Sequence, residues 1–130
     1  MTWMAASIKW IMLVSGALTC TMLYAAFAPE AALKSSFGES IETGPIAEVV
    51  VRNWGVLIGL IGAMLIYGAF VPNVRPLILI IAAISKLVFI ALVFANGLAS
   101  QAIVPIAVDL IVTALFVVYL LDLRRMKIAP

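Results

Sequence analysis

The stretch 77-LILIIAAISKLVFIALVFA-95 decides the fold class of this chain. It carries one charge, Lys86, and its apolar residues do not alternate with polar ones. A transmembrane helix needs roughly 20 mostly apolar residues, whereas the strand of a membrane barrel is about half as long and alternates. A lone segment in lipid must also satisfy its own backbone hydrogen bonds, which favours a helix. The stretch therefore predicts a membrane-spanning α-helix.

Three further windows have the same character, at about 8–28, 54–71 and 102–121. Over all 130 residues the chain is 66% hydrophobic and only 11% charged. A soluble domain of this size could not hide so much apolar surface from water. We therefore expect an all-α integral membrane protein with one transmembrane domain over residues 1–130.

The links between the predicted spans differ in length. Residues 29–53 form a long polar outer loop, which includes Glu39 and Glu42. The links "PNVRP" (72–76) and "NGLASQ" (96–101) are short, and residues 122–130 form a tail. Short links make consecutive helices antiparallel. The expected architecture is an up-down-up-down bundle of four transmembrane helices.

The outer loop contains two helix signals. "PEAALKSSFG" (29–38) begins with proline and glutamate and ends with glycine, which predicts a short helix. We expect this helix to be interfacial, on the outer membrane surface. Gly44 and Pro45 start a second helix that runs without a break into the second span.

A polar group, Glu48, Arg52, Asn53 and Trp54, precedes the apolar part of the second span. Glu48 and Arg52 are four residues apart, so they could pair on one side of a helix. The favoured interpretation is an interface anchor with a tryptophan at headgroup level. The alternative is the polar rim of an outward-facing pocket.

The basic residues predict the orientation. With both termini cytoplasmic, the inner side carries five of them, Lys9, Arg75, Arg124, Arg125 and Lys127. The outer side then carries Lys34 and Arg52. An excess of lysine and arginine marks the cytoplasmic side. We expect a bacterial inner-membrane protein with N and C termini in the cytoplasm.

The first span could also be a cleavable signal peptide. "AFA" (26–28) has the small-x-small form of a cleavage site. Pro29 follows directly, however, and a tertiary amide is a poor protease substrate. We expect the segment to be retained as the first helix.

Small residues predict where helices approach closely. The second span carries Gly55, Gly59, Gly62 and Ala63, which we assign to a helix-packing face. The first span offers a comparable patch of Ser15, Gly16, Thr19 and Cys20. Packing inside the bundle is favoured over contact between protomers.

Two ionisable residues lie deep inside spans, Lys86 in the third and Asp109 in the fourth. Lys86 is nine residues from either end of its window, or roughly 13–14 Å at 1.5 Å per residue. Asp109 is seven residues from the outer end of its window, about 10 Å deep. Each charge alone in hydrocarbon costs about 2.5–3.5 kcal/mol. Because neighbouring helices carry them at similar depth, we expect an intramembrane ion pair.

This pair has two interpretations. In the favoured one it is buried and fixes how the third and fourth spans pack. In the other it faces a cavity and serves a polar ligand or a proton relay. Thr113 and Pro105, four residues to either side of Asp109, are possible supporters of such a pocket.

The composition excludes several kinds of site. The chain has no histidine and a single cysteine, Cys20, so the usual haem, zinc and copper ligands are missing. No nucleophile stands at a useful spacing from a base, and a net charge of +2 is too small to suggest nucleic-acid binding. We expect no enzyme activity, no metal, no cofactor and no nucleic-acid partner.

The overall pattern resembles the small bacterial four-helix membrane proteins grouped around the DoxX-like families. The resemblance rests on four spans in about 130 residues, a long first outer loop, and "RNWG" (52–55) before a glycine-rich second span. It also rests on a basic residue in span three and an acidic one in span four. Those families often have arginine and glutamate there, where this chain has Lys86 and Asp109. The resemblance implies the fold and no catalytic residue.

The sequence favours a structural or accessory role. The protein would be a subunit or stabiliser of a larger membrane complex, or a homo-oligomer, with the lipid bilayer and another membrane protein or itself as partners. The alternative is a small-solute or proton-coupled transporter or channel that uses Lys86 and Asp109 as its polar site.

Overall fold

The computed structural model of the chain describes residues 2–37 and 44–128, and every regular element within them is helical. Four helical segments are long and apolar enough to cross a membrane, Ala6–Phe27, Pro45–Phe70, Pro72–Ala95 and Ile103–Arg125. The predicted all-α, four-span fold is confirmed. The loop residues Glu39 and Glu42 lie outside the described residues.

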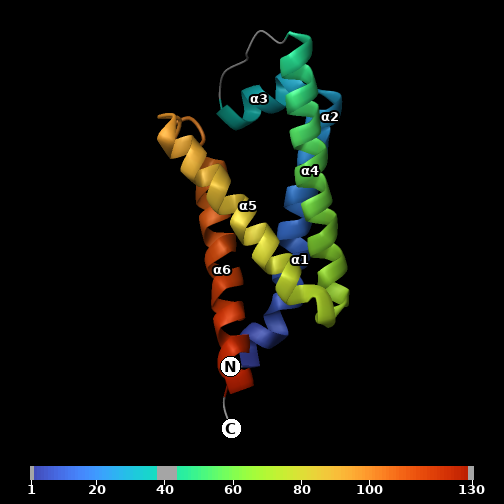
Figure 1. The fold of residues 1–130 in the computed structure, drawn as a ribbon, viewed down its shortest axis with the longest axis vertical. Helices are drawn as coiled ribbons and strands as arrows, with labels where there is room; N and C mark the ends of the chain where they lie inside the picture. Colours follow the sequence, from blue (N-terminus) through green and yellow to red (C-terminus); the bar gives the residue numbers. More distant parts are fainter. Residues whose placement is uncertain (1, 38–43, 129–130) are drawn as a thin grey trace.

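The element bounds extend the predicted windows. The first span comprises α1 (Thr2–Cys20), the 3-10 turn η1 (Thr21–Leu23) and α2 (Tyr24–Phe27). The short loop helix is α3 (Pro29–Phe37), and α4 (Pro45–Phe70) contains the second span. A 3-10 turn, η2 (Pro72–Val74), leads into α5 (Arg75–Ala95), and α6 (Ile103–Ile128) continues well into the predicted tail. The four long segments alternate in direction, as Figure 1 shows.

The bundle has two distinct ends (Figure 1). At one, the terminus end, α1 begins, α6 ends and η2 joins α4 to α5. At the other, the α3 end, α3 lies crosswise beside the upper part of α4, on the side toward α5 and α6. The α1–α4 pair and the α5–α6 pair pack closely within themselves and less extensively against each other. The two pairs therefore behave as two hairpin-like halves that meet along one side.

Glycines hold α1 and α4 together. A Cβ added at Gly62 would lie 2.6 Å from the Cys20 nitrogen, and one at Gly55 would lie 2.7 Å from the Ala25 Cβ. Gly59 has no more room, because a Cβ there would overlap the Leu23 side chain. Ala63, by contrast, is exposed and lies off this face. The close approach between α4 and the first span (α1, η1 and α2) thus depends on Gly55, Gly59 and Gly62.

An apolar core closes the terminus end of the bundle. Residues of all four long helices contribute to it: Ile8, Met12, Leu65, Ala69, Ile78, Leu79, Ala82, Phe116 and Tyr119. A smaller cluster at the α3 end joins α5 to the start of α6 through Ile90, Val93, Ala102 and Ile106. The four helices are therefore packed together near the termini, whereas at the other end each helix pair packs within itself.

Arg75 stabilises the turn between α4 and α5. Its Nε donates to the Gly68 carbonyl at 3.0 Å and its Nη2 to the Ala69 carbonyl at 2.8 Å. The last carbonyls of a helix have no partner within the helix and carry partial negative charge. The buried guanidinium satisfies two of them, so Arg75 has a structural role beyond its contribution to the charge on this side.

The outer surface of the bundle is apolar. Large hydrophobic side chains such as Leu57, Ile84, Leu92, Val104 and Ile111 are exposed along the four spans. Soluble proteins rarely expose a continuous apolar surface of this extent. The surface fits contact with lipid tails and supports an integral membrane protein.

Candidate functional site

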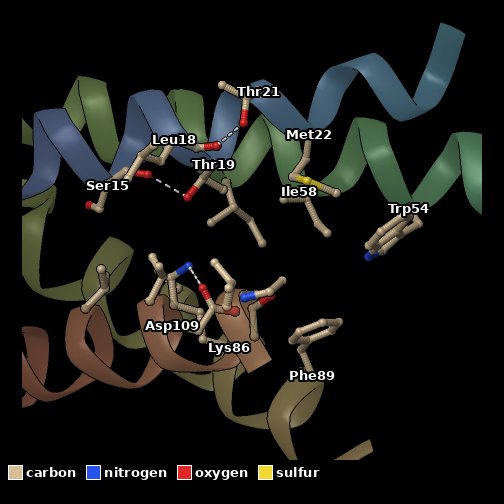
Figure 2. A pocket seen from close by; sticks show the side chains of 17 residues that line it. Ser15, Leu18, Thr19, Thr21, Met22, Trp54, Ile58, Lys86, Phe89 and Asp109 are labelled. Atoms are coloured by element: carbon tan, nitrogen blue, oxygen red, sulfur yellow. Dashed lines mark hydrogen bonds and ion pairs between the residues drawn. The ribbon is translucent and has the colours of Figure 1, made fainter. Parts of the chain in front are cut away.

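A cavity of about 370 Å³ lies between the two helix pairs, in the half of the bundle nearer α3. All four spans contribute to its wall (Figure 2). The lining residues are Ser15, Leu18, Thr19, Thr21, Met22, Trp54, Ile58, Ile61, Ala82, Ser85, Lys86, Phe89, Val104, Pro105, Val108, Asp109 and Val112. Most of this wall is apolar, and the polar groups are few and concentrated.

Lys86 and Asp109 form an ion pair on one wall of this cavity. Lys86 Nζ lies 2.8 Å from Asp109 Oδ1, across the contact between α5 and α6. The two side chains keep 12% and 20% of their surface exposed, and both line the cavity. At 1.5 Å per residue, Lys86 is roughly 14 Å from the end of α5, too deep for a lysine stem to reach water. The pair therefore relieves the cost of two charges in lipid while remaining open to the cavity.

The hydroxyl groups of Ser15 and Thr19 in the first span face this pair from the opposite wall (Figure 2). Thr19 Oγ1 donates to the Ser15 carbonyl at 2.6 Å, and Ser15 Oγ donates to the Met12 carbonyl at 3.4 Å. Thr21 Oγ1 donates to the Leu18 carbonyl one turn earlier. All three hydroxyls donate within the helix, and the oxygens of Ser15 and Thr19 keep lone pairs on the side that faces the cavity, whereas the Thr21 hydroxyl lies on the other side of the helix.

Two aromatic side chains mark the side of the cavity nearest α3. Trp54 from α4 and Phe89 from α5 line the cavity, and both also line a second hollow of about 290 Å³ beneath α3. The Phe89 ring lies 6.3 Å from the Phe37 ring of α3, measured between centroids. Tyr24 and Ser35 share a hydrogen bond that ties α3 to α2. α3 thus covers the second hollow, and the two aromatic rings separate it from the cavity.

Of the two predicted pocket supporters, Pro105 lines the cavity and Thr113 does not. Thr113 is buried, and among the described residues its Oγ1 has no hydrogen-bond partner. Its side chain lies one turn further from the α3 end than Asp109.

The polar residues that precede the second span differ in whether they line the cavity. Trp54 lines the cavity, whereas Glu48, Arg52 and Asn53 do not. The sequence left open a pairing of Glu48 with Arg52, but Arg52 Nη1 donates to the Ala26 carbonyl. That carbonyl is in the last turn of α2, where backbone carbonyls have no hydrogen-bond partner within the helix. This turn packs against α4, which carries Arg52. The helix end, and not the glutamate one turn earlier, is therefore the partner of the guanidinium.

The small residues of the first span also point in two directions. Gly16 and Cys20 pack against α4, and Cys20 Sγ donates to the Gly59 carbonyl at 3.7 Å. Ser15 and Thr19 face the cavity instead. Their four-residue spacing was the available signal, since it puts both hydroxyls on one face, but the sequence alone assigned them only to packing.

The site holds no grouping suited to a metal. Within residues 2–37 and 44–128, no three histidine, cysteine or acidic side chains come together. The polar chemistry of the cavity is confined to one ion pair, four hydroxyls and one indole.

Comparison with known proteins finds no matching family model, no matching curated protein and no matching solved structure. The resemblance to the DoxX-like families therefore stays a prediction. Function has to be argued from the cavity itself.

Proposed function

We propose that this protein binds a small amphiphilic molecule inside the membrane, with the polar group of that molecule at Lys86 and Asp109. The observation that carries the proposal is that the ion pair lines a cavity of about 370 Å³. Small-molecule sites in proteins are typically concave, mostly apolar and about 300–1,000 Å³, with a few placed polar groups. Ionisable residues within a span are by default candidates for a functional site.

The shape of the cavity supports a ligand that comes from the lipid or from the α3 side. The packed core at the terminus end, which includes Leu79 and Phe116, closes the cavity in that direction. The walls are apolar, so they favour an alkyl chain over a fully polar solute. The polar wall groups then fix the position of the head group.

The tryptophans offer a direct binding assay. Trp54 lines the cavity, while Trp10 is 65% exposed and is not among the lining residues. A protein whose only tryptophan is Trp54 (W3F/W10F) reports the cavity, and one that keeps only Trp10 (W3F/W54F) reports partition into lipid. A bromoalkyl amphiphile quenches tryptophan fluorescence on contact. We expect saturable quenching of Trp54 in nanodiscs and a linear, unsaturated response from Trp10.

A cavity-filling variant tests whether that binding occurs in this site. Val108→Phe adds a ring to a lining residue without altering the ion pair. Val118→Phe, also on α6, makes the same change at an exposed position outside the cavity. Both substitutions are made in the Trp54-only protein. Saturable quenching should be lost in the first variant and retained in the second; equal loss or equal retention would contradict the proposal.

Carriage of the bound molecule across the membrane is the second candidate function. It is favoured by the asymmetry of the cavity, which lies at the α3 end and is closed by the apolar core at the terminus end. A carrier needs a state open to one side only. Flux of the amphiphile into proteoliposomes, abolished by Lys86→Ala, would support it, and binding without flux would leave the protein as a binding component.

An accessory role in a larger complex follows if binding is accompanied by a stoichiometric partner. Purification in a mild detergent, followed by analysis of copurifying proteins, tests this. We also infer that the termini are cytoplasmic and that the α3 end faces outward in a bacterial inner membrane, from the distribution of basic residues. A green-fluorescent-protein fusion at the C terminus should fluoresce, because that reporter matures only in the cytoplasm.

A further inference from the structure

The charges of the cavity wall bear on which head group it accepts. Among the described residues that line it, Lys86 and Asp109 are the only charged ones, and they carry opposite charges. The wall is therefore neutral overall. A ligand with a single charge would leave one charge uncompensated in a low-dielectric site, which is costly. An uncharged head group avoids this cost.

The α5 side of the cavity can donate hydrogen bonds. Lys86 has three N–H groups, and among the described residues Asp109 Oδ1 is the one acceptor it contacts. Ser85, the residue before it, also lines the cavity, and its hydroxyl makes no bond within the described part of the chain. A ligand atom near this wall should therefore accept a hydrogen bond.

The α1 side of the cavity offers mainly hydrogen-bond acceptors. Ser15, Thr19 and Thr21 have given their hydroxyl hydrogens to carbonyls of their own helix. The oxygens of Ser15 and Thr19 keep lone pairs that face the space opposite Lys86 and Asp109 (Figure 2). A ligand atom between the two walls should therefore donate toward α1 while it accepts from α5.

We propose that the ligand is an uncharged single-chain amphiphile with a hydroxyl-bearing head group, of the long-chain alcohol or monoacylglycerol class. A hydroxyl group is both donor and acceptor, so it can bridge the two walls without adding charge. Its alkyl chain packs against the apolar wall, toward Trp54 and Phe89. This inference rests on the proposed function and names its ligand class.

Four bromoalkyl probes of equal chain length test the head group, each titrated into the Trp54-only protein in nanodiscs. They are an alcohol, its methyl ether, a carboxylate and a primary amine. Because an uncompensated charge is costly, we expect the alcohol to bind at least about tenfold more tightly than the carboxylate or the amine. The ether lacks the donor and should bind more weakly than the alcohol. A carboxylate or amine that binds as tightly as the alcohol, or an ether equal to it, would overturn the inference.

Changing the net charge of the cavity wall should change which head group binds most tightly, in a direction set by the charge that remains. Asp109→Asn leaves Lys86 uncompensated, so the carboxylate should become the preferred probe. Lys86→Gln leaves Asp109 uncompensated and should favour the amine. If either single variant fails to fold, the uncharged double variant K86Q/D109N keeps the test, because the alcohol should remain the preferred probe. Unchanged preferences in the folded single variants, or a charged preference in the double variant, would overturn the inference.

The same titrations distinguish failure of the proposed binding function from failure of the hydroxyl inference. If none of the probes quenches Trp54 in a saturable way beyond the Trp10 control, both the proposed function and this inference are wrong. If a charged probe binds saturably and Val108→Phe abolishes it, the proposed function stands and the hydroxyl inference is wrong.

Discussion

Lys86 Nζ lies 2.8 Å from Asp109 Oδ1, and the pair lines a cavity instead of being enclosed in the apolar core. A salt bridge sealed between two helices would serve packing alone. This one joins α5 to α6 and also exposes part of each charge to a space that a small molecule can occupy. Stability and ligand binding should therefore depend on the same two residues, and they can be separated by experiment.

Removing one member of the pair should destabilise the protein more than removing both. Lys86→Met or Asp109→Leu leaves the other member of the pair as an uncompensated charge, at an expected cost of about 2–4 kcal/mol in the free energy of unfolding. The double variant K86M/D109L removes both charges of the pair, so most of that cost should be recovered. Denaturant unfolding in detergent micelles measures all three. A double variant as unstable as the sum of the single variants would show that charge compensation is not the reason for the pair.

The α1–α4 contact should be sensitive to a single methyl group. Gly62→Ala would put a Cβ within 2.6 Å of the Cys20 backbone nitrogen, so the helices must separate, at an expected cost of about 1–3 kcal/mol. Gly44→Ser is the matched control: its Cβ meets open space, and serine suits the N-cap position that Gly44 occupies before α4. Thermal unfolding should show a loss for the first variant and little change for the second. Equal stabilities would mean that the close approach is not required.

The turn at the terminus end should depend on the fork geometry of Arg75. Arg75→Ala removes two charge-assisted hydrogen bonds to Gly68 and Ala69, with an expected cost of about 2–4 kcal/mol. Arg75→Lys should recover only part of it, since an ammonium cannot reproduce the paired donors. Arg124→Ala removes an exposed charge and serves as the control. Full recovery by lysine would indicate that only the positive charge matters.

The position of α3 should depend on its aromatic contact with α5. Phe37→Ala removes the ring that lies 6.3 Å from Phe89, so α3 should exchange backbone hydrogens faster than in the parent protein. Phe27→Ala, at an 82% exposed position, is the control. Hydrogen exchange followed by mass spectrometry resolves the α3 peptide. Unchanged exchange there in the Phe37 variant would mean that α3 is held by its other contacts.

Much of this architecture could be predicted from the sequence, because apolar length and proline or glycine punctuation are local signals. The short link after Ala95 makes α5 and α6 neighbours, and counted depths bring Lys86 close to Asp109, so contact between them was also predictable. Ala63 was assigned to the glycine face, but it follows Gly62 and therefore points about 100° away.

The cavity itself could not be predicted from the sequence. It exists because the two helix pairs pack tightly at the terminus end and less closely near α3, and such angles arise from three-dimensional packing. The same holds for Arg52, whose partner is the Ala26 carbonyl, 26 residues away, and not the glutamate one turn before it. Ser15 and Thr19 became cavity residues only once the opposite wall was in place.

Quenching of Trp54 by a bromoalkyl alcohol, compared with quenching of Trp10 in the matched single-tryptophan protein, shows whether the cavity binds an amphiphile. If the cavity over Lys86 and Asp109 binds an amphiphile, quenching of Trp54 will saturate, and an unbrominated alcohol of equal chain length will reverse it, while Trp10 responds linearly. If Trp54 and Trp10 respond alike, without saturation or reversal, the cavity does not bind the probe and the account is contradicted.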